Sequence, residues 1–224
     1  MNKFGSILCA ILLKPLIDAY LVKKIEGLEN LPKGNFILAV NHQSNLDHVA
    51  AGYVCLPRSF RFIGQVDGHN GLKKWLVKAA YAITGVIPLD RTSSESKKTV
   101  IEKAIGYAKK GDIIALYPEG TRTRNGQMGD PKPGVAKIFL GSGVPIVPVA
   151  VKGTFELFPP HGKLKIKKIV EIKVGKPIYF KKEFQAAKNL SYKSEEYKKI
   201  CQRISEKVMD NIVKLAGQKK NEGN

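Results

Sequence analysis

Short runs of apolar residues recur along the chain and are separated by turn-forming residues. The first, Phe36–Val40, is entirely apolar and follows the turn signal Pro32–Gly34. A continuous apolar run of about four to eight residues is typical of a strand that is covered on both faces. We expect further strands at four similar runs: Phe60–Ile63, Val86–Leu89, Ile113–Tyr117 and Val144–Val151.

Helical patterns fill the gaps between these runs. Apolar residues that recur every three or four positions indicate amphipathic helices, and they do so at Leu46–Tyr53, Leu72–Ile83, Lys97–Lys109 and Val135–Leu140. Strands that alternate with helices build parallel sheets. The chain is therefore predicted to have an α/β fold, with a largely parallel or mixed sheet flanked by helices.

The last third of the chain adds two patterns. Residues Leu164–Val174 alternate between apolar and charged side chains, which predicts a strand with one solvated face. An amphipathic helix is predicted to start at the N-cap residue Ser194 and to end at Gly217. Residues 217–224 are a polar tail.

The N-terminal segment is strongly apolar but contains Lys14, Pro15 and Asp18. A helix over Ile7–Val22 would span about 24 Å, too little for a hydrocarbon layer of roughly 30 Å. We therefore expect an amphipathic helix that lies in one leaflet, with lysines at its end contacting anionic headgroups. A helix docked on the protein's own core and a cleaved signal peptide are the alternatives.

The net charge of the chain indicates a kind of partner that the pattern of helices and strands does not show. The chain has 38 Lys and Arg against 19 Asp and Glu, a net charge of +19, so an anionic partner is expected. Nucleic acid, anionic membrane lipids and an acidic carrier protein all fit this charge. The basic residues are scattered and no recognition motif is present, which argues against nucleic acid. Three separated cysteines and four histidines lack the spacing of a metal site, so we expect reduced thiols and no metal.

A histidine and an aspartate stand where chemistry is favoured. His42 directly follows the strand Phe36–Val40, and Asp47 lies five positions later, where the next helix is predicted to begin. A carboxylate in that first turn can orient an imidazole and support its protonated form. Arg91 and Glu119 also follow predicted strands. Since the carboxyl ends of parallel strands meet at one edge of a sheet, we expect these side chains to converge there.

Four sequence blocks resemble the signatures of the glycerolipid acyltransferase family. Residues 41–47 read Asn-His-Gln-Ser-Asn-Leu-Asp, similar to the Asn-His-x-Ser-x-x-Asp of bacterial-type lysophosphatidic acid acyltransferases, and blocks at 85–91, 117–122 and 144–148 follow in the family's order. The resemblance covers about residues 34–153. Two departures concern substrate detail: Tyr117 stands where Phe is usual, and Pro88-Leu89 replaces a Phe-Ile pair.

The resemblance implies a glycerol-3-phosphate acyltransferase-like fold and a reaction. A fatty acyl group would move from acyl-CoA or acyl-acyl carrier protein to the hydroxyl of 1-acylglycerol 3-phosphate (lysophosphatidic acid), which forms phosphatidic acid. His42 would be the general base and Asp47 would orient it. The acceptor phosphate and glycerol would be bound by five residues: Arg91, Glu119, Gly120, Thr121 and Arg122. Neither a metal nor a bound cofactor is implied.

Several alternatives remain open. The acceptor could be glycerol 3-phosphate or another lysophospholipid, and a protein that binds lipid without catalysis would share the fold. Ser44 could act as a nucleophile, but no Gly-x-Ser-x-Gly elbow is present, so we interpret it with Asn45 as a helix cap. His48 is predicted to lie on the surface, and Lys97, Lys98, Lys132 and Lys137 are candidates to extend a phosphate site.

The expected organisation has three parts. Residues 1–30 form a membrane-associating helical segment, residues 31–216 an acyltransferase domain, and residues 217–224 the tail. A lipid acceptor and a basic surface together predict a peripheral or monotopic enzyme at the cytoplasmic face of the cell membrane.

Overall fold

Strands from the whole length of the chain form one sheet in the computed structural model, which describes residues 3–66, 71–123 and 125–218. Within those ranges the sheet has seven strands in the order β1-β7-β6-β2-β5-β3-β4. Neighbouring strands run parallel except β6 and β7, which are antiparallel. The strands are β1 (Val22–Glu26), β2 (Ile37–Val40), β3 (Phe60–Gln65), β4 (Ile87–Leu89), β5 (Ile113–Leu116), β6 (Ile146–Lys152) and β7 (Val170–Val174).

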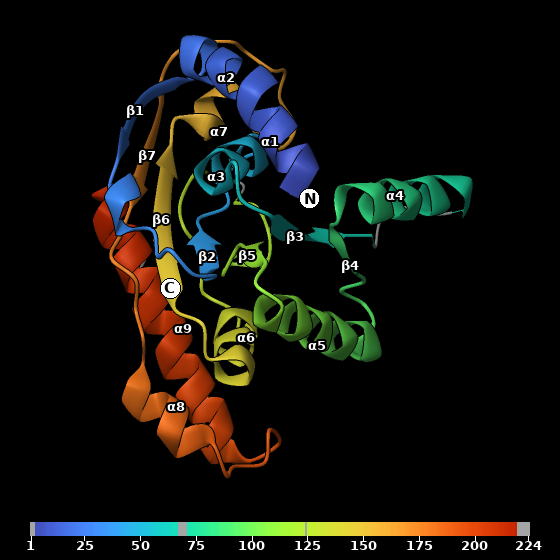
Figure 1. Ribbon diagram of the computed structural model, residues 1–224, viewed down its shortest axis with the longest axis vertical. Helices are drawn as coiled ribbons and strands as arrows, with labels where there is room; N and C mark the ends of the chain where they lie inside the picture. Colours follow the sequence, from blue (N-terminus) through green and yellow to red (C-terminus); the bar gives the residue numbers. More distant parts are fainter. Residues whose placement is uncertain (1–2, 67–70, 124, 219–224) are drawn as a thin grey trace.

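Helices cover both faces of this sheet (Figure 1). They are α1 (Lys3–Leu12), α2 (Lys14–Tyr20), α3 (Asp47–Cys55), α4 (Gly71–Thr84), α5 (Ser94–Lys109), α6 (Gly134–Ser142), α7 (Thr154–Leu157), α8 (Lys181–Ala187) and α9 (Glu195–Ala216), with a short 3-10 helix at Leu28–Asn30. The prediction of a mixed sheet flanked by helices is thus confirmed. Strand β2 at the centre is completely buried, as its unbroken apolar sequence predicts.

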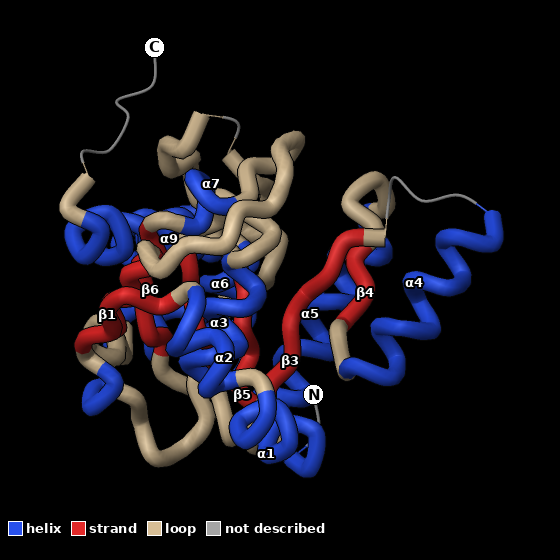
Figure 2. Tube along the Cα trace, turned by 90° about the horizontal axis from the view of Figure 1, so that it is seen from above, coloured by secondary structure: helices blue, strands red, loops and turns tan. Residues whose placement is uncertain are grey.

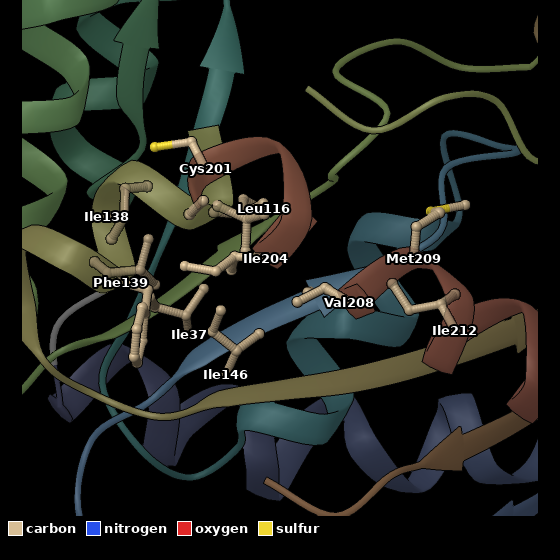
Figure 3. Packing of buried hydrophobic residues seen from close by; sticks show 14 of the residues in the cluster. Ile37, Leu116, Ile138, Phe139, Ile146, Cys201, Ile204, Val208, Met209 and Ile212 are labelled. Carbon is tan, nitrogen blue, oxygen red and sulfur yellow. The ribbon is translucent and has the colours of Figure 1, made fainter. Parts of the chain in front are cut away.

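Two apolar cores lie on opposite faces of the sheet. On one face, α9 packs Ile204, Val208 and Ile212 against Ile37 of β2 and Ile146 of β6 (Figure 3). On the other face, α3 packs against Leu38 and Val40 of the same strand β2. Each fully buried side chain of this kind contributes roughly 1.5–3 kcal/mol relative to exposure. The two cores together hold β2, and therefore His42 at its end, in a fixed position.

The ends of α9 and α5 follow their capping residues. Ser194 accepts a hydrogen bond from the backbone N–H of Tyr197, and Gly217 ends α9 with a φ of 62°, as predicted. Helix α5 starts three residues before the predicted Lys97 because Ser93 caps it by accepting from the N–H of Ser96.

The N-terminal prediction is wrong in its details. Instead of one helix over Ile7–Val22 there are two, α1 and α2, with Pro15 in the first turn of the second. Proline is tolerated there because it lacks only an N–H that the helix start does not use. Val22 begins strand β1, which pairs with β7, so the segment 1–30 also contributes a strand to the sheet. Every helix in the described ranges is too short or too polar to cross a membrane.

The predicted strand Leu164–Val174 is also too long. Only Val170–Val174 forms a strand, β7, whereas residues 164–169 pair with none of the described strands and lie largely exposed. The short helices α7 and α8 have no counterpart in the prediction, because each is too short to show a helical period.

Candidate active site

A cavity of about 1640 Å³ opens at the carboxyl edge of the sheet. It is lined by residues that follow three parallel strands: His42 after β2, Arg91 after β4 and Glu119 after β5. The structure thus brings together side chains that the sequence places far apart. Part of the lining is apolar and includes Ile101 and Ile105 of α5 and Ile138 of α6.

His42 and Asp47 form a buried pair beside this cavity. Nδ1 of His42 lies 2.9 Å from Oδ2 of Asp47, and Asp47 is completely buried. A carboxylate only accepts, so Nδ1 of the neutral ring carries the hydrogen and Nε2 keeps its lone pair. No described residue forms a hydrogen bond with Nε2, and the ring lines the cavity. Nε2 is therefore available to a substrate hydroxyl.

Three further hydrogen bonds fix Asp47. Its Oδ2 accepts from the backbone N–H groups of Gln43 and Ser44, both at 2.6 Å, and its Oδ1 accepts from the hydroxyl of Thr154, also at 2.6 Å. The donors come from the loop after β2 and from the start of α7. In each of these contacts the partner donates a hydrogen bond to the carboxylate, and together they hold the Asp47 side chain in one orientation. Thr154 was not predicted, although it follows β6, which is the strand next to β2.

Glu119 supports His42 from the opposite side. One carboxyl oxygen accepts from the backbone N–H of His42 at 2.7 Å, and the other accepts from the N–H of Gly129 at 2.9 Å. Burial raises the pKa of Glu119 from 4.5 to about 7, although the two backbone hydrogen bonds lower it. Glu119 was predicted to contact the acceptor. In this structure it holds the backbone of the catalytic candidate, and its contact with the acceptor stays a prediction.

The ring of Tyr117 stacks on that of His42, with centroids 3.8 Å apart and planes 11° apart. Its hydroxyl lies 2.9 Å from Nδ1 of His48. The ring of His48 packs against His42, Phe62 and Tyr117, and desolvation by these neighbours is the main cause that lowers its pKa to about 4. Burial raises the pKa of Tyr117. At neutral pH the phenol therefore donates to a neutral His48. His48 is exposed, as predicted for a surface residue, and it also lines the cavity.

The predicted acceptor residues surround one side of the cavity. Arg122 donates to the side-chain oxygen of Asn45 at 2.7 Å, and Arg91 lies 3.5 Å from the carbonyl oxygen of Gly120. Gly120 has a φ of 70°, a backbone conformation that favours glycine. The hydroxyl of Thr121 donates to the carbonyl of Arg122. Four lysines line the same cavity: Lys97, Lys98, Lys132 and Lys137. The rim is thus rich in groups that bind phosphate.

Ser44 has a structural role. Its hydroxyl is buried, donates to the carbonyl of Phe158 at 2.6 Å and accepts from the N–H of Leu46 at 3.1 Å. The prediction that Ser44 and Asn45 cap the next helix is wrong, because α3 has Leu46 at its N-cap and no side-chain cap. Within the described ranges, no group of three or more His, Cys, Asp or Glu side chains is placed to hold a metal ion.

Fold and site together define an α/β protein with a buried histidine–aspartate pair at the carboxyl edge of its sheet. Residues 23–152 match the sequence profile of the acyltransferase family. The chain belongs to the acyltransferase family.

Curated relatives point in the same direction. The chain is 32% identical over 164 residues to a chloroplastic 1-acyl-sn-glycerol-3-phosphate acyltransferase of Brassica napus, an overlap of 69% of this chain and 44% of that protein. It is 32% identical over 135 residues to the corresponding enzyme of Borreliella burgdorferi, covering 60% of this chain and 52% of that protein. The chain thus spans about half the length of the curated relatives it matches.

A solved structure shares the fold. It is the 1-acyl-sn-glycerophosphate acyltransferase PlsC of Thermotoga maritima, which superposes with a TM-score of 0.61 over 88% of this chain and 74% of that chain. The sequence identity is 24%, so this likeness shows the architecture alone.

Proposed function

We propose that the protein transfers a fatty acyl group from an acyl thioester to the free hydroxyl of 1-acylglycerol 3-phosphate, and so forms phosphatidic acid. The observation that carries this proposal is the buried His42–Asp47 pair at a cavity with a cationic rim and an apolar interior. The relatives named 1-acyl-sn-glycerol-3-phosphate acyltransferases support the choice of acceptor.

The proposed reaction begins with His42. Nε2 accepts the proton of the acceptor hydroxyl while the oxygen attacks the thioester carbonyl, and Asp47 stabilises the imidazolium that forms. The tetrahedral intermediate then breaks its carbon–sulfur bond, and the departing thiolate takes the proton back from His42. Base catalysis of this kind contributes about 10²–10⁴-fold. Alignment of the two substrates in the cavity supplies a further part of the acceleration.

The two halves of the cavity suit the two parts of the substrates. Arg91, Arg122 and the rim lysines can bind phosphate, since a guanidinium matches two phosphate oxygens and keeps its charge. The apolar walls of α5 and α6 suit an acyl chain, whose transfer out of water is favourable by about 0.8 kcal/mol per methylene. The proposed donor is acyl-CoA or acyl-acyl carrier protein, both of which carry negative charge on the part of the molecule that bears the thioester arm.

The proposed location is the cytoplasmic face of the cell membrane. Helices α1 and α2 expose large apolar side chains, among them Phe4, Ile11, Leu12, Leu16 and Tyr20. Such surfaces bind at the interface of a bilayer, and the net charge of +19 favours anionic lipids.

A transfer assay with three acceptors tests the function. Detergent-dispersed 1-acylglycerol 3-phosphate, glycerol 3-phosphate and lysophosphatidylcholine would each be incubated with labelled acyl-CoA or acyl carrier protein thioester. We expect labelled phosphatidic acid as the main product. A clear preference for one of the other acceptors would replace the substrate assignment, and the absence of transfer with both donors would show a lipid-binding protein without catalysis.

A further inference from the structure

The segment between α7 and β7 carries apolar side chains that no part of the described protein covers. All residues from His161 to Lys168 are exposed, with exposed fractions of 53% for Leu164 and 70% for Ile166. The alternation of apolar and basic residues in this segment predicts a strand, yet no described strand pairs with it. The segment thus has apolar and basic side chains in alternation, but it does not use them in a sheet. A partner that contacts both kinds of side chain must itself have an apolar region next to a charged one.

The charge of the segment is of one sign. Four of its six residues from 163 to 168 are lysines, and no acidic residue occurs between Glu156 and Glu171. None of these lysines forms an ion pair with a described residue. The segment therefore offers its positive charge to a partner outside the chain.

The position of the segment connects the cavity with the N-terminal helices. At its start, the carbonyl of Phe158 accepts from the buried hydroxyl of Ser44, and Pro160 and His161 line the cavity. At its end, the N–H of Val170 donates to the carbonyl of Leu21, directly after α2, at 2.9 Å. Figure 1 shows α1, α2, α7 and this connection at the upper end of the molecule, to which β2 and β6 point; Figure 2 looks onto that end.

We propose that residues 163–168 are a second lipid-binding element, which docks on an anionic bilayer beside α1 and α2. Leu164 and Ile166 enter the boundary between headgroups and acyl chains, while the neighbouring lysines stay at the level of the phosphates. The inference rests on the proposed function in one respect: a lipid acceptor reaches the cavity only if its rim faces the bilayer.

The chemistry of the segment favours a bilayer over other anionic partners. A polynucleotide would pair with the lysines but would leave Leu164 and Ile166 in water. A bilayer receives both kinds of side chain. It would also receive the side chains of Leu13, directly before α2, and of Leu16 and Tyr20 in α2, which are each about half exposed or more. The segment and α2 are linked where the N–H of Val170 donates to the carbonyl of Leu21, so both can contact the same bilayer.

Two variants of the full chain test the proposal. One carries Leu164→Ser and Ile166→Ser; the other carries Gln at Lys163, Lys165, Lys167 and Lys168. Tyr179→Ser is the matched control, because Tyr179 is 50% exposed and lies in the connection from β7 to α8, at the opposite end in Figure 1. Each protein is sedimented with vesicles of phosphatidylcholine, with and without phosphatidylglycerol, and assayed on detergent-dispersed 1-acylglycerol 3-phosphate.

The expected results differ between the variants. The serine variant should lose about tenfold or more in partition to anionic vesicles. The glutamine variant should lose up to about fivefold per lysine and should bind with a weaker salt dependence. Both should keep the wild-type melting temperature and the wild-type rate in detergent, and the control should match wild type in every measurement.

Three outcomes would overturn the proposal. Unchanged vesicle binding in both folded variants would show that the segment does not contact lipid. A raised KM for acyl carrier protein in detergent, with normal vesicle binding, would identify an acidic protein as the partner. A change of oligomeric state in the serine variant would identify a second copy of this chain. If the wild type transfers no acyl group in detergent, the proposed function fails, and the vesicle experiment still decides whether the segment binds lipid.

Discussion

His42 is the residue on which the proposed chemistry depends, and its ring contributes little to the core. We predict that His42→Ala lowers the transfer rate by at least about 10²-fold while the protein stays folded, because the general base is lost and the cores of α3 and α9 are untouched. The comparison variant is Asp47→Asn. The amide N–H groups of the new asparagine would lie against backbone N–H groups that donate to the carboxylate in the wild type. Because two donors cannot form a hydrogen bond, this variant should lose stability as well as transfer rate. Near-normal turnover in folded His42→Ala would refute the mechanism.

Glu119 makes the stability of the protein depend on pH. Its pKa is raised from 4.5 to about 7, so the folded state binds a proton there more tightly than the unfolded chain. The resulting stabilisation is fully present below pH 4.5 and is lost as the pH rises through about 7. Relative to Glu119→Gln, the free energy of unfolding of the wild type should fall by about 3 kcal/mol over this range.

Urea unfolding at a series of pH values measures this difference. Glu206→Gln, which removes an exposed carboxyl from α9, is the control and should follow the wild-type curve. Parallel pH curves for the wild type and Glu119→Gln would show that the pKa of Glu119 is not raised.

Arg91 is predicted to bind the acceptor phosphate in the ground state and in the transition state alike. Arg91→Ala should therefore raise the KM of the acceptor about tenfold or more and change kcat and the KM of the donor much less. Arg203→Ala on the exposed face of α9 removes the same charge away from the cavity and should leave all three constants unchanged. A rise in the donor KM alone would assign Arg91 to the thioester instead.

The order of the sheet explains which site residues the sequence reveals. His42, Arg91 and Glu119 follow apolar strands, so the rule that carboxyl ends meet at one edge locates them. The hydrogen bonds of these side chains could not be predicted, because they join residues that are far apart in the sequence. The hydroxyl of Thr154 reaches Asp47 across 107 positions, and Glu119 reaches the backbone of His42 across 77. The sequence does not predict the contact of His48 with Tyr117, because helical spacing does not show that Tyr117 lies opposite it.

Helix α1 precedes every described strand, so its removal leaves all seven strands of the sheet in the chain. Helix α2 is anchored on α3, since Asp18 accepts from the hydroxyl of Tyr53 and Lys14 lies over the same ring. We predict that deletion of residues 1–12 lowers binding to anionic vesicles and activity on bilayer substrate, with little effect on activity in detergent. Vesicle sedimentation and thermal melting of the truncated protein measure this. A truncated protein that binds vesicles as the full chain does would remove α1 from the account of membrane association.

Elements with a long apolar period were predictable, and short or irregular ones were not. The five strand runs and α9 have patterns that tertiary contacts do not change. Strand β1 was missed because Leu21 and Val22 continue the apolar N-terminal run, and only the pairing with β7 shows that the helix has ended. The segment 164–169 was misjudged because alternation shows two faces without showing what covers them.

At the scale of the whole molecule, the charge of +19 predicts how membrane association responds to salt. Attraction to an anionic surface extends over a Debye length, about 10 Å at 0.1 M and about 3 Å at 1 M salt. Binding to vesicles that contain phosphatidylglycerol should therefore weaken steeply over this range, whereas binding to phosphatidylcholine alone should be weaker and nearly constant. Sedimentation at several salt concentrations measures both. Equal salt dependence on the two kinds of vesicle would exclude charge as a determinant.

The place of β1 in the sheet also has a consequence in time. β1 is an edge strand whose sole neighbour in the described sheet is β7, and the paired side chains Lys23 and Glu171 are 148 positions apart. A ribosome that adds about 5–20 residues per second needs roughly 7–30 s to make that stretch. During that interval α1 and α2 have been synthesised, but β1 cannot yet pair with β7. We expect α1 and α2 to bind the bilayer during translation. The sheet would then be completed on a chain that is already bound to the membrane at which we propose that it acts.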